Sequence, residues 1–290
     1  LPQDELLFDL KKVSPLRMNN VLKKAKNILY VITLDDPTSE SRALRRLVSK
    51  DALNLINADT TRYIKLDRDL YANGQLVMYL FARTSDMMAN RIDENAAYIR
   101  SVFESEERER LKKRLFKSQE REIEKQLTDK HGYLIEIPYG YEVAKNVDNF
   151  VWIRQLGAGM NKNFFVYSED YNTQYQLDRI ADLREEITGK YLRDSEKEDL
   201  YITQQEILPM ITDTISFNNK FALRNKGLWK VSDSSAGGPY ISYVIVDEKI
   251  GKLYYLEGYV YAPGSDKKNF MREMDAILST FKTPSQLEAQ

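Results

Sequence analysis

The C-terminal part of the chain consists largely of short segments with the side-chain alternation of β-strands. Four such segments are 212–217, 220–229, 240–246 and 253–261. In the last of them, one face of the strand carries Tyr255, Glu257, Tyr259 and Tyr261, and the other carries Tyr254, Leu256, Gly258 and Val260. A period of two residues is the geometry of a sheet. This part of the chain is therefore predicted to be built on a β-sheet, which needs a covering layer of helices or a second sheet.

Helical patterns occur between the strand patterns along the whole chain. After Thr84, apolar residues recur every three or four positions from Met88 to Phe103, which marks one buried face of a helix. Further helices are expected over 39–56, 175–191 and 270–281, and further strands over 28–32, 61–71, 75–81, 133–137, 141–144, 151–155 and 164–167. The strand at 28–32 is apolar throughout, so we expect it to be buried on both faces. Asn73-Gly74 is expected to form a tight hairpin turn.

The order of these segments predicts an α+β fold. We expect two α/β sandwich-like halves with antiparallel sheets, joined by a long charged helix. The stretch 104–130 carries charges of both signs at helical spacing, which is typical of a solvated helix, and Gly132 is expected to end it. We divide the chain into an N-terminal half, 1–128, which ends in this helix, and a C-terminal sandwich, 129–290. Alternatively, the helix is an assembly scaffold, which requires an exposed apolar seam at Leu111, Leu115 and Leu127.

Composition excludes several classes of function. The chain has 43 basic and 44 acidic residues, a net charge of −1, so it lacks the overall field that attracts nucleic acid. No run of eighteen apolar residues occurs, so no membrane-spanning helix is expected. Cysteine is absent and His131 is the single histidine, which argues against thiol chemistry and zinc sites. We predict no cofactor and no metal site, although a carboxylate-only calcium or magnesium site is left open.

No motif of a known enzyme class stands out, and we predict no catalytic residue. A serine in a Gly-x-Ser-x-Gly elbow is absent, which disfavours an α/β-hydrolase. The carboxylates to consider for a glycoside hydrolase pair are Glu136, Glu142, Asp148, Glu169 and Asp170. Their spacing does not require such a pair, since several acidic residues near strand ends are expected in a chain this acidic.

Aromatic residues and glycines suggest one candidate binding surface. Trp229, Gly237, Gly238 and Tyr240 flank a polar loop, and Tyr141, Trp152, Tyr255 and Tyr259 add aromatic rings to the same predicted sheet. Exposed rings of this kind could stack on sugars or peptides, and Arg154 could recognise a carboxylate or phosphate. The alternative is that the glycines form a turn, that the rings fill the core, and that Arg154 makes a cross-strand ion pair.

Several long segments together resemble one family. They are LPQDELLFDL, SEERERL, YLIEIPYGYEVAKNVDNFVWIR, GLWKV, AGGPYISYVIVD and EGYVYAP, in this order. The chain resembles DUF4837, a family of uncharacterised envelope lipoproteins from Bacteroidetes-type bacteria. The resemblance implies a lipidated cysteine upstream and a tether to the cell envelope, and it implies a further strand and helix before Leu1. It transfers no catalytic residue, because the family has no established activity.

The second half separately resembles the PsbP-type α/β sandwich. The features that carry this likeness are Ile137-Pro138, the helix over 175–191, the four late strands and the closing Leu278-Ser279-Thr280-Phe281. A fold-level likeness does not confer function. We therefore predict a non-catalytic envelope lipoprotein ectodomain that binds an unknown ligand or envelope protein or serves a structural role, with no nucleic-acid partner and no membrane contact other than a lipid anchor. The alternative is a carboxylate-dependent hydrolase of envelope sugars or peptides.

Overall fold

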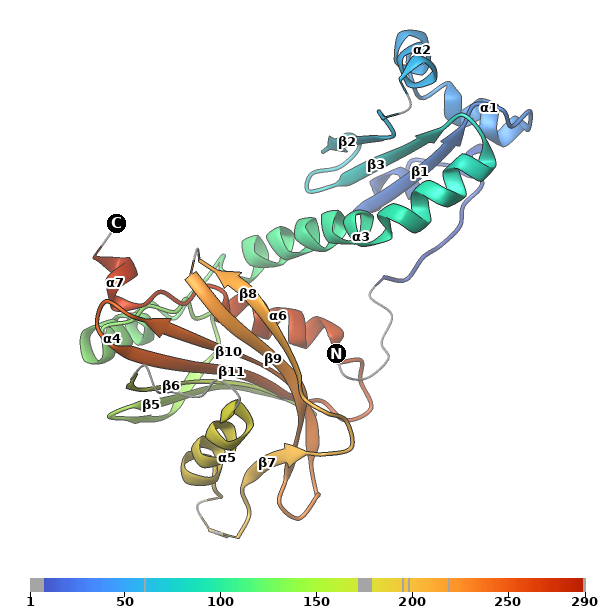
Figure 1. Ribbon diagram of the computed structural model, residues 1–290. Coiled ribbons are helices and arrows are strands. Elements are labelled where there is room, and N and C mark those ends of the chain that lie inside the picture. Colours follow the sequence, from blue (N-terminus) through green and yellow to red (C-terminus); the bar gives the residue numbers. More distant parts are fainter. Residues whose placement is uncertain are drawn as a thin grey trace. The chain divides into compact units, whose positions relative to one another are not determined.

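The computed structural model describes residues 8–59, 61–171, 179–194, 196–197, 199–218 and 220–288. Two compact units are distinguished, an N-terminal unit over Phe8–Arg110 and a C-terminal unit that contains Leu111–Gln290 (Figure 1). Each unit combines a sheet with helices, which confirms the α+β fold class.

The N-terminal unit is a three-stranded sheet with helices on both faces. Its elements are η1 (Pro15–Arg17), η2 (Leu22–Lys24), β1 (Asn27–Thr33), α1 (Ser39–Arg45), α2 (Lys50–Ala58), β2 (Ile64–Arg68), β3 (Leu76–Ala82) and α3 (Ser85–Leu115), whose last turn enters the C-terminal unit. The strand order is β1-β3-β2. β2 is antiparallel to β3, but β1 is parallel to it, so the expectation of a purely antiparallel sheet is wrong for this unit.

The central strand β3 forms the core of the N-terminal unit and is buried along its whole length. One face of the sheet packs against α1 and α2, and the other packs against α3. The expectation that the strand at 28–32 is buried on both faces is wrong, because β1 is an edge strand that leaves Leu29 and Val31 exposed. The hairpin between β2 and β3 is confirmed, with Gly74 at a positive φ of 69°, but its loop is longer than a two-residue turn.

One expected helix is two helices in the structure. α1 and α2 occupy the stretch predicted as a single helix over 39–56. Each has its own N-cap, since the side chain of Thr38 accepts from the backbone of Ser41 and that of Ser49 accepts from Ala52. Ser49 therefore starts a second helix where apolar periodicity alone predicted continuation.

The C-terminal unit is built on one curled sheet of eight strands. Its elements are α4 (Arg121–His131), β4 (Glu142–Val147), β5 (Phe150–Gly157), β6 (Met160–Asp170), α5 (Ile180–Tyr191), β7 (Ile202–Gln205), β8 (Ile211–Phe217), β9 (Lys220–Val231), β10 (Gly237–Asp247), β11 (Lys252–Tyr261), α6 (Lys268–Leu278) and α7 (Pro284–Leu287). The strand order is β4-β5-β6-β11-β10-β9-β7, and β8 also pairs with β9. Each of these pairs is antiparallel.

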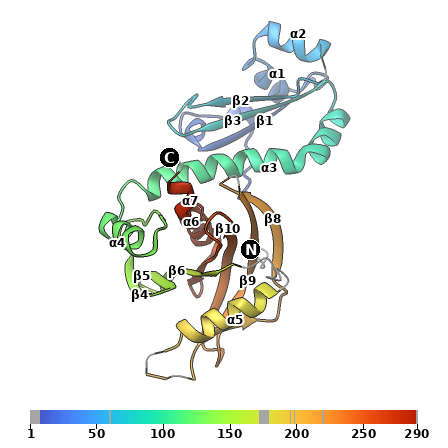
Figure 2. The ribbon, with the colours of Figure 1, turned by 60° about the vertical axis from the view of Figure 1, so that its left-hand side comes forward.

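Two helices cover opposite faces of this sheet (Figure 2). α6 places Met274, Ile277 and Leu278 on one face, and α5 places Leu183 and Ile187 on the other. The close approach of α6 requires a glycine in β11, because a Cβ atom at position 258 would lie 2.7 Å from the Cβ of Met274. The sheet is therefore buried on both sides.

The expected helix over 104–130 is interrupted. α3 ends at Leu115 and α4 begins at Arg121, because the backbone between them pairs with a distant segment: the Glu120 N–H donates to Ile137 O at 2.8 Å. The end of α4 at Gly132 is confirmed, with a φ of 77°. Leu127 is fully buried in the C-terminal core and Leu115 packs against it, so the seam that a scaffold role needs is largely covered within the chain.

Other differences are local. The segment 133–137 buries Ile135 and Ile137, but it pairs through one isolated bridge, between Leu134 and Lys282, and is not a strand. β7 was not expected, and Pro284, which lies beyond the end of α6, begins the short helix α7. The expected helix over 175–191 is observed from Ile180, and positions 175–178 lie outside the described residues. Among the described helices, none has the length and apolar character to cross a membrane.

Candidate functional site

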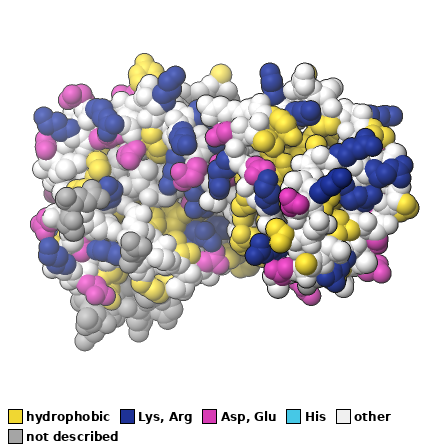
Figure 3. All heavy atoms as spheres, turned by 90° about the horizontal axis from the view of Figure 1, so that it is seen from above, with side chains coloured by type: hydrophobic (Ala, Val, Ile, Leu, Met, Phe, Trp, Pro, Cys, Tyr) yellow, Lys and Arg dark blue, Asp and Glu magenta, His cyan; other side chains and the backbone are white. Residues whose placement is uncertain are grey.

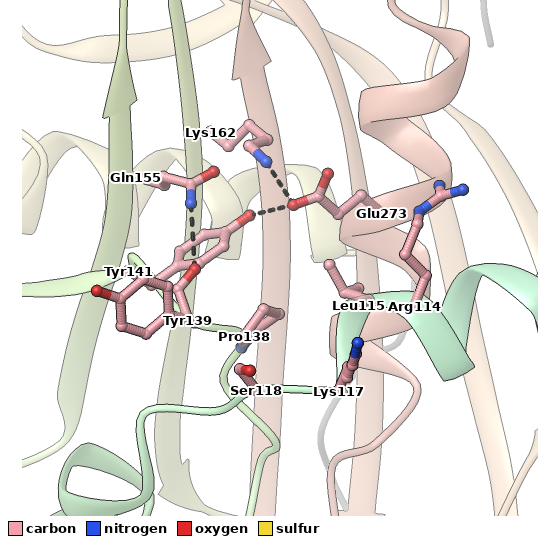
Figure 4. Close-up of a pocket in the computed structure, with 10 residues that line it drawn as sticks. All are labelled: Arg114, Leu115, Lys117, Ser118, Pro138, Tyr139, Tyr141, Gln155, Lys162 and Glu273. Carbon is pink, nitrogen blue, oxygen red and sulfur yellow. Dashed lines mark hydrogen bonds and ion pairs between the residues drawn. The ribbon is translucent and has the colours of Figure 1, made fainter.

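A pocket of about 360 Å³ opens on the C-terminal unit (Figure 4). Three parts of the chain meet there: the end of α3 with the loop after it, the segment before β4 with β5 and β6, and α6. The lining residues are Arg114, Leu115, Lys117, Ser118, Pro138, Tyr139, Tyr141, Gln155, Lys162 and Glu273. Residues about 160 positions apart in the sequence thus contribute to one site.

Hydrogen bonds between the loop after α3 and the segment before β4 shape one wall of the pocket. The Tyr139 N–H donates to Ser118 O at 3.0 Å, and the Gly140 N–H donates to a carboxylate oxygen of Glu120 at 2.6 Å. Gly140 has a φ of 89°, a conformation that favours glycine. This turn leaves the Tyr139 ring 72% exposed, so an aromatic surface borders the pocket.

An ion pair with a tyrosine lies at the back of the pocket. Lys162 Nζ lies 2.5 Å from Glu273 Oε1, and the Tyr141 hydroxyl donates to the same oxygen at 2.9 Å (Figure 4). Lys162 and Tyr141 are buried. Burial, with the nearby Glu273 carboxylate, raises the pKa of the Tyr141 hydroxyl well above its usual value, so this hydroxyl stays protonated and acts as a donor. Lys162 and Glu273 neutralise each other.

Two cations at the pocket have no such partner. Arg114 and Lys117 are exposed, and within the described part of the chain neither forms an ion pair or a side-chain hydrogen bond. Because Glu273 is the one carboxylate among the lining residues and is paired with Lys162, the pocket has an excess of two positive charges. With Tyr139, Pro138 and Leu115 as apolar surface, the pocket can hold an anion that has a ring or apolar part.

Most of the predicted binding residues lie elsewhere. Tyr141 lines the pocket, whereas the side chains of Trp229, Tyr240, Tyr255 and Tyr259 are buried on the face of the sheet that α5 covers. The Trp229 indole N–H donates to Val260 O at 3.2 Å. These rings form part of a core, and their role in binding stays a prediction.

The predicted glycines, Trp152 and Arg154 also have structural roles. A Cβ atom at Gly238 would collide with the carbonyl oxygen of Val260, and one at Gly237 would lie 2.8 Å from Trp229 O, so both positions serve close strand packing. The half-buried Trp152 donates from its indole to Asn163 Oδ1 at 3.1 Å. Arg154 donates to Glu142 Oε1 at 2.8 Å, which is the cross-strand ion pair that the sequence suggested as an alternative.

The carboxylates considered for a hydrolase do not line the pocket. Glu142 pairs with Arg154, and Asp170 lies 2.6 Å from Lys252 Nζ. Glu169 accepts from the Tyr167 hydroxyl at 3.0 Å, and Glu136 accepts from Gln119 Nε2 at 2.7 Å. Asp148 is exposed between β4 and β5. Across the described residues, no three side chains of His, Cys, Asp or Glu gather as a metal site would require.

A polar row, buried except at Thr212, crosses the face of the sheet that α5 covers and was not predicted. Glu257, Ser242, Asn225 and Thr212 are in register on β11, β10, β9 and β8. Asn225 Nδ2 donates to Ser242 Oγ at 3.1 Å, and Thr212 Oγ1 donates to Asn225 Oδ1 at 2.9 Å. Arg184 of α5 pairs with Glu257 above this row. The sequence contained one sign of it, a single glutamate among the aromatic residues of the last strand.

Comparison with known families places two matches on the chain. The family described as Domain of unknown function (DUF4837) matches residues 120–280, and Domain of unknown function (DUF8532) matches residues 1–116. No curated protein has a significant sequence match. Neither family description carries an activity or a site.

Three of the solved structures that match show distant likeness. A Bacteroides thetaiotaomicron protein is 9% identical with a TM-score of 0.31, and the match covers 52% of this chain and 44% of that one. The Saccharomyces cerevisiae Ran-binding protein Mog1p is 7% identical with a TM-score of 0.36, over 53% of this chain and 92% of that one. An uncharacterised Rhizobium leguminosarum protein is 10% identical with a TM-score of 0.18, over 45% and 97%. With scores this low, function has to be argued from the chain's own residues.

Proposed function

The chain belongs to the family described as Domain of unknown function (DUF4837), and we propose that its C-terminal unit is a non-catalytic binding module that takes an anionic ligand in the pocket of Figure 4. The ligand class that fits is a small molecule with a carboxylate or phosphate on a ring, such as an acidic sugar. A volume of about 360 Å³ is near the lower end of the roughly 300–1,000 Å³ of small-molecule sites.

The observation that carries this proposal is the uncompensated charge of Arg114 and Lys117 beside the exposed ring of Tyr139. A guanidinium binds carboxylate or phosphate with two parallel hydrogen bonds, and a lysine adds a flexible point charge. The tyrosine ring offers an apolar face on which a sugar ring can stack. Together these groups match both parts of an acidic sugar.

The same geometry supports binding over hydrolysis. A glycosidase needs two carboxyl groups about 5–10 Å apart, one of them free to donate a proton. Glu273 is the one carboxylate of the described lining, and its Oε1 already accepts from Lys162 and Tyr141. We therefore propose that the pocket binds its ligand without hydrolysing it. The described lining offers no pair of carboxyl groups for the hydrolase alternative.

We further propose that this module works in the cell envelope, held by a lipidated cysteine upstream of Leu1. Family resemblance supports this location. Metabolic labelling of the native full-length precursor with a fatty acid tests it. Incorporation that depends on an upstream cysteine supports the proposal, and an unlabelled protein in the soluble cytoplasmic fraction contradicts it.

A titration with glucuronate tests the proposed ligand class, with glucose as the matched neutral sugar. In amide NMR spectra of the chain, we expect glucuronate to shift the signals of Lys117, Ser118, Tyr139 and Gly140, and glucose to shift them much less. The proposal is contradicted when neither sugar shifts them at about 10 mM, tenfold above a millimolar dissociation constant, or when both shift them equally.

A further inference from the structure

Two stretches of the N-terminal unit are strongly basic within a chain of balanced charge. Residues 10–26 contain six Lys or Arg and no Asp or Glu, and residues 41–50 contain four Lys or Arg and no Asp or Glu. The whole chain has 43 basic and 44 acidic residues. This local excess is unrelated to the pocket of the C-terminal unit, so it needs its own explanation.

The two basic stretches lie over the same face of the N-terminal sheet. η1 contacts α1, and Met18, Leu44 and Val48 pack in one cluster on the sheet face opposite α3. α2 covers the same face through Ile56. Lys23 of η2 lies over the ring of Tyr71, which packs in the same cluster. Side chains that point outward from η1, η2, α1 and α2 therefore share one surface, which we call the basic face. Figure 3 shows dark blue Lys and Arg side chains gathered there, with yellow hydrophobic ones among them.

Most Lys and Arg side chains of the basic face form no ion pair within the described residues. Arg17, Lys24, Arg46 and Lys50 have no ion pair or side-chain hydrogen bond within the described residues. Arg45 donates to backbone carbonyl groups of Thr33 and Asp36, which leaves its positive charge in place. Lys26 and Arg42 likewise donate to backbone carbonyl groups, whereas Lys11 lies 3.9 Å from Asp9 Oδ2. α1 and α2 also carry the exposed acids Glu40 and Asp51, but the Lys and Arg residues outnumber them, so the face keeps its cationic character.

Large aliphatic side chains stand among these cations. Leu16 is 59% exposed, Val21 80%, Leu47 45% and Leu55 52%. Exposed leucine and valine beside unpaired lysine and arginine is the composition of surfaces that lie in the boundary between lipid headgroups and acyl chains. Proteins that bind single-stranded nucleic acid instead present aromatic rings for stacking, and none of the large exposed apolar side chains on this face is aromatic.

We propose that the basic face docks on an anionic phospholipid surface, with its lysines and arginines at the headgroups and Leu16, Val21 and Leu47 in the interface. Charge complementarity selects this occupant, because each Lys or Arg close to an anionic bilayer contributes roughly a fivefold gain in affinity. The contact orients the N-terminal unit on the membrane. It is independent of the proposed anion pocket, which lies on the other unit.

Co-sedimentation of the full chain with lipid vesicles tests this inference. We expect binding to vesicles that contain phosphatidylglycerol, little binding to pure phosphatidylcholine, and weakening with added salt. The variant K24Q/R46Q/K50Q is expected to lose roughly a hundredfold in affinity, at about fivefold per charge. Leu47→Ser is expected to weaken binding while it leaves the salt dependence unchanged.

The control variant R100Q/K113Q/K125Q removes the same charge from exposed positions of α3 and α4 and is expected to bind as the wild type does. Circular dichroism verifies that each variant is folded. Three results would overturn the proposal. They are equal binding to both vesicle types, equal losses in the basic-face and control variants, and tighter binding to a DNA duplex than to anionic vesicles. Arg114→Gln with Lys117→Gln should leave vesicle binding intact, which separates this test from that of the pocket.

Discussion

Arg184 of α5 and Glu257 of β11 form a two-point ion pair from which solvent is fully excluded. Arg184 Nε lies 2.9 Å from Glu257 Oε2, and Nη2 lies 2.8 Å from Oε1. The Tyr255 hydroxyl donates to Oε2 at 2.8 Å, and the guanidinium lies 4.1 Å from the centroid of the Tyr240 ring. Both charges are thus satisfied inside the core, and the pair links α5 to the centre of the sheet.

Removing one partner of this pair should be costly. Glu257→Gln leaves the buried guanidinium of Arg184 without a counter-charge, so we expect the free energy of unfolding to fall by about 3–5 kcal/mol. Arg184→Met combined with Glu257→Leu removes both charges and should lose less than either single change. Urea denaturation measures Glu257→Gln, Arg184→Met and the double variant. A single variant as stable as the wild type contradicts this interpretation.

Gly258 should not tolerate a side chain. In Gly258→Ala the new methyl group would lie 2.7 Å from the Met274 Cβ, and such overpacking is expected to cost about 1–3 kcal/mol. Gly189 of α5 is the matched control, because among the described residues no atom outside the local helix backbone lies within 4 Å of a Cβ at that position. Gly189→Ala should stabilise the protein by up to about 1 kcal/mol, since alanine favours the helix. Thermal denaturation distinguishes the two, and equal effects would show that α6 does not pack as described.

Stability should fall in acid through Asp247. This buried carboxylate lies 3.1 Å from Lys220 Nζ and accepts from the Ser285 N–H at 3.2 Å. Burial alone would raise its pKa, but the hydrogen bonds from Thr283, Ser285 and Lys220 outweigh burial and hold the pKa below its usual value. A lowered folded-state pKa contributes stability above the unfolded value of about 3.9, and this contribution is lost as the pH falls through the folded value.

The variant Asp247→Asn isolates this effect. We expect wild type and variant to differ most in unfolding free energy above about pH 4 and to converge below it. Denaturation curves at a series of pH values provide the comparison. A difference that stays constant down to the lowest pH would assign the role of Asp247 to packing instead of charge.

The variant Glu273→Gln distinguishes a binding pocket from a catalytic one. Glu273→Gln removes the counter-charge of Lys162, so the pocket becomes more positive and glucuronate affinity should rise roughly threefold, as expected for one charge about 6 Å away in water. An essential acid would instead make the same variant inactive without strengthening anion binding. Calorimetry reports the change, and a weaker affinity in the variant contradicts the binding account.

Local patterns in the sequence predicted most of the fold. The alternation at 253–261 is strand β11, the stripe from Met88 to Phe103 lies in α3, and Gly132 ends α4 as expected. The break between α1 and α2 at Ser49 is local, but two other errors came from long-range contacts. The break between α3 and α4 depends on backbone pairing of Glu120 with Ile137, and β1 is exposed on one side because it lies at a sheet edge.

The candidate site was harder to predict for the same reason. Tyr141 was singled out as an aromatic residue, but its partner Glu273 is 132 positions away, and no local spacing connects the two. Lys162 and Arg114 were not singled out, because no local pattern distinguishes them among 43 basic residues. Tyr255 and Tyr259 of the last strand were candidates for a binding surface, but they face α5 and belong to the core.

The binding account depends most directly on the charges of Arg114 and Lys117. Titration calorimetry should show that R114Q/K117Q binds glucuronate about thirtyfold more weakly than the wild type, given about 1 kcal/mol per charge at 4 Å in water. Lys113→Gln, which changes an exposed charge of the same helix outside the pocket, should bind as the wild type does. An unchanged affinity in the double variant, or the same loss in Lys113→Gln, would contradict the account.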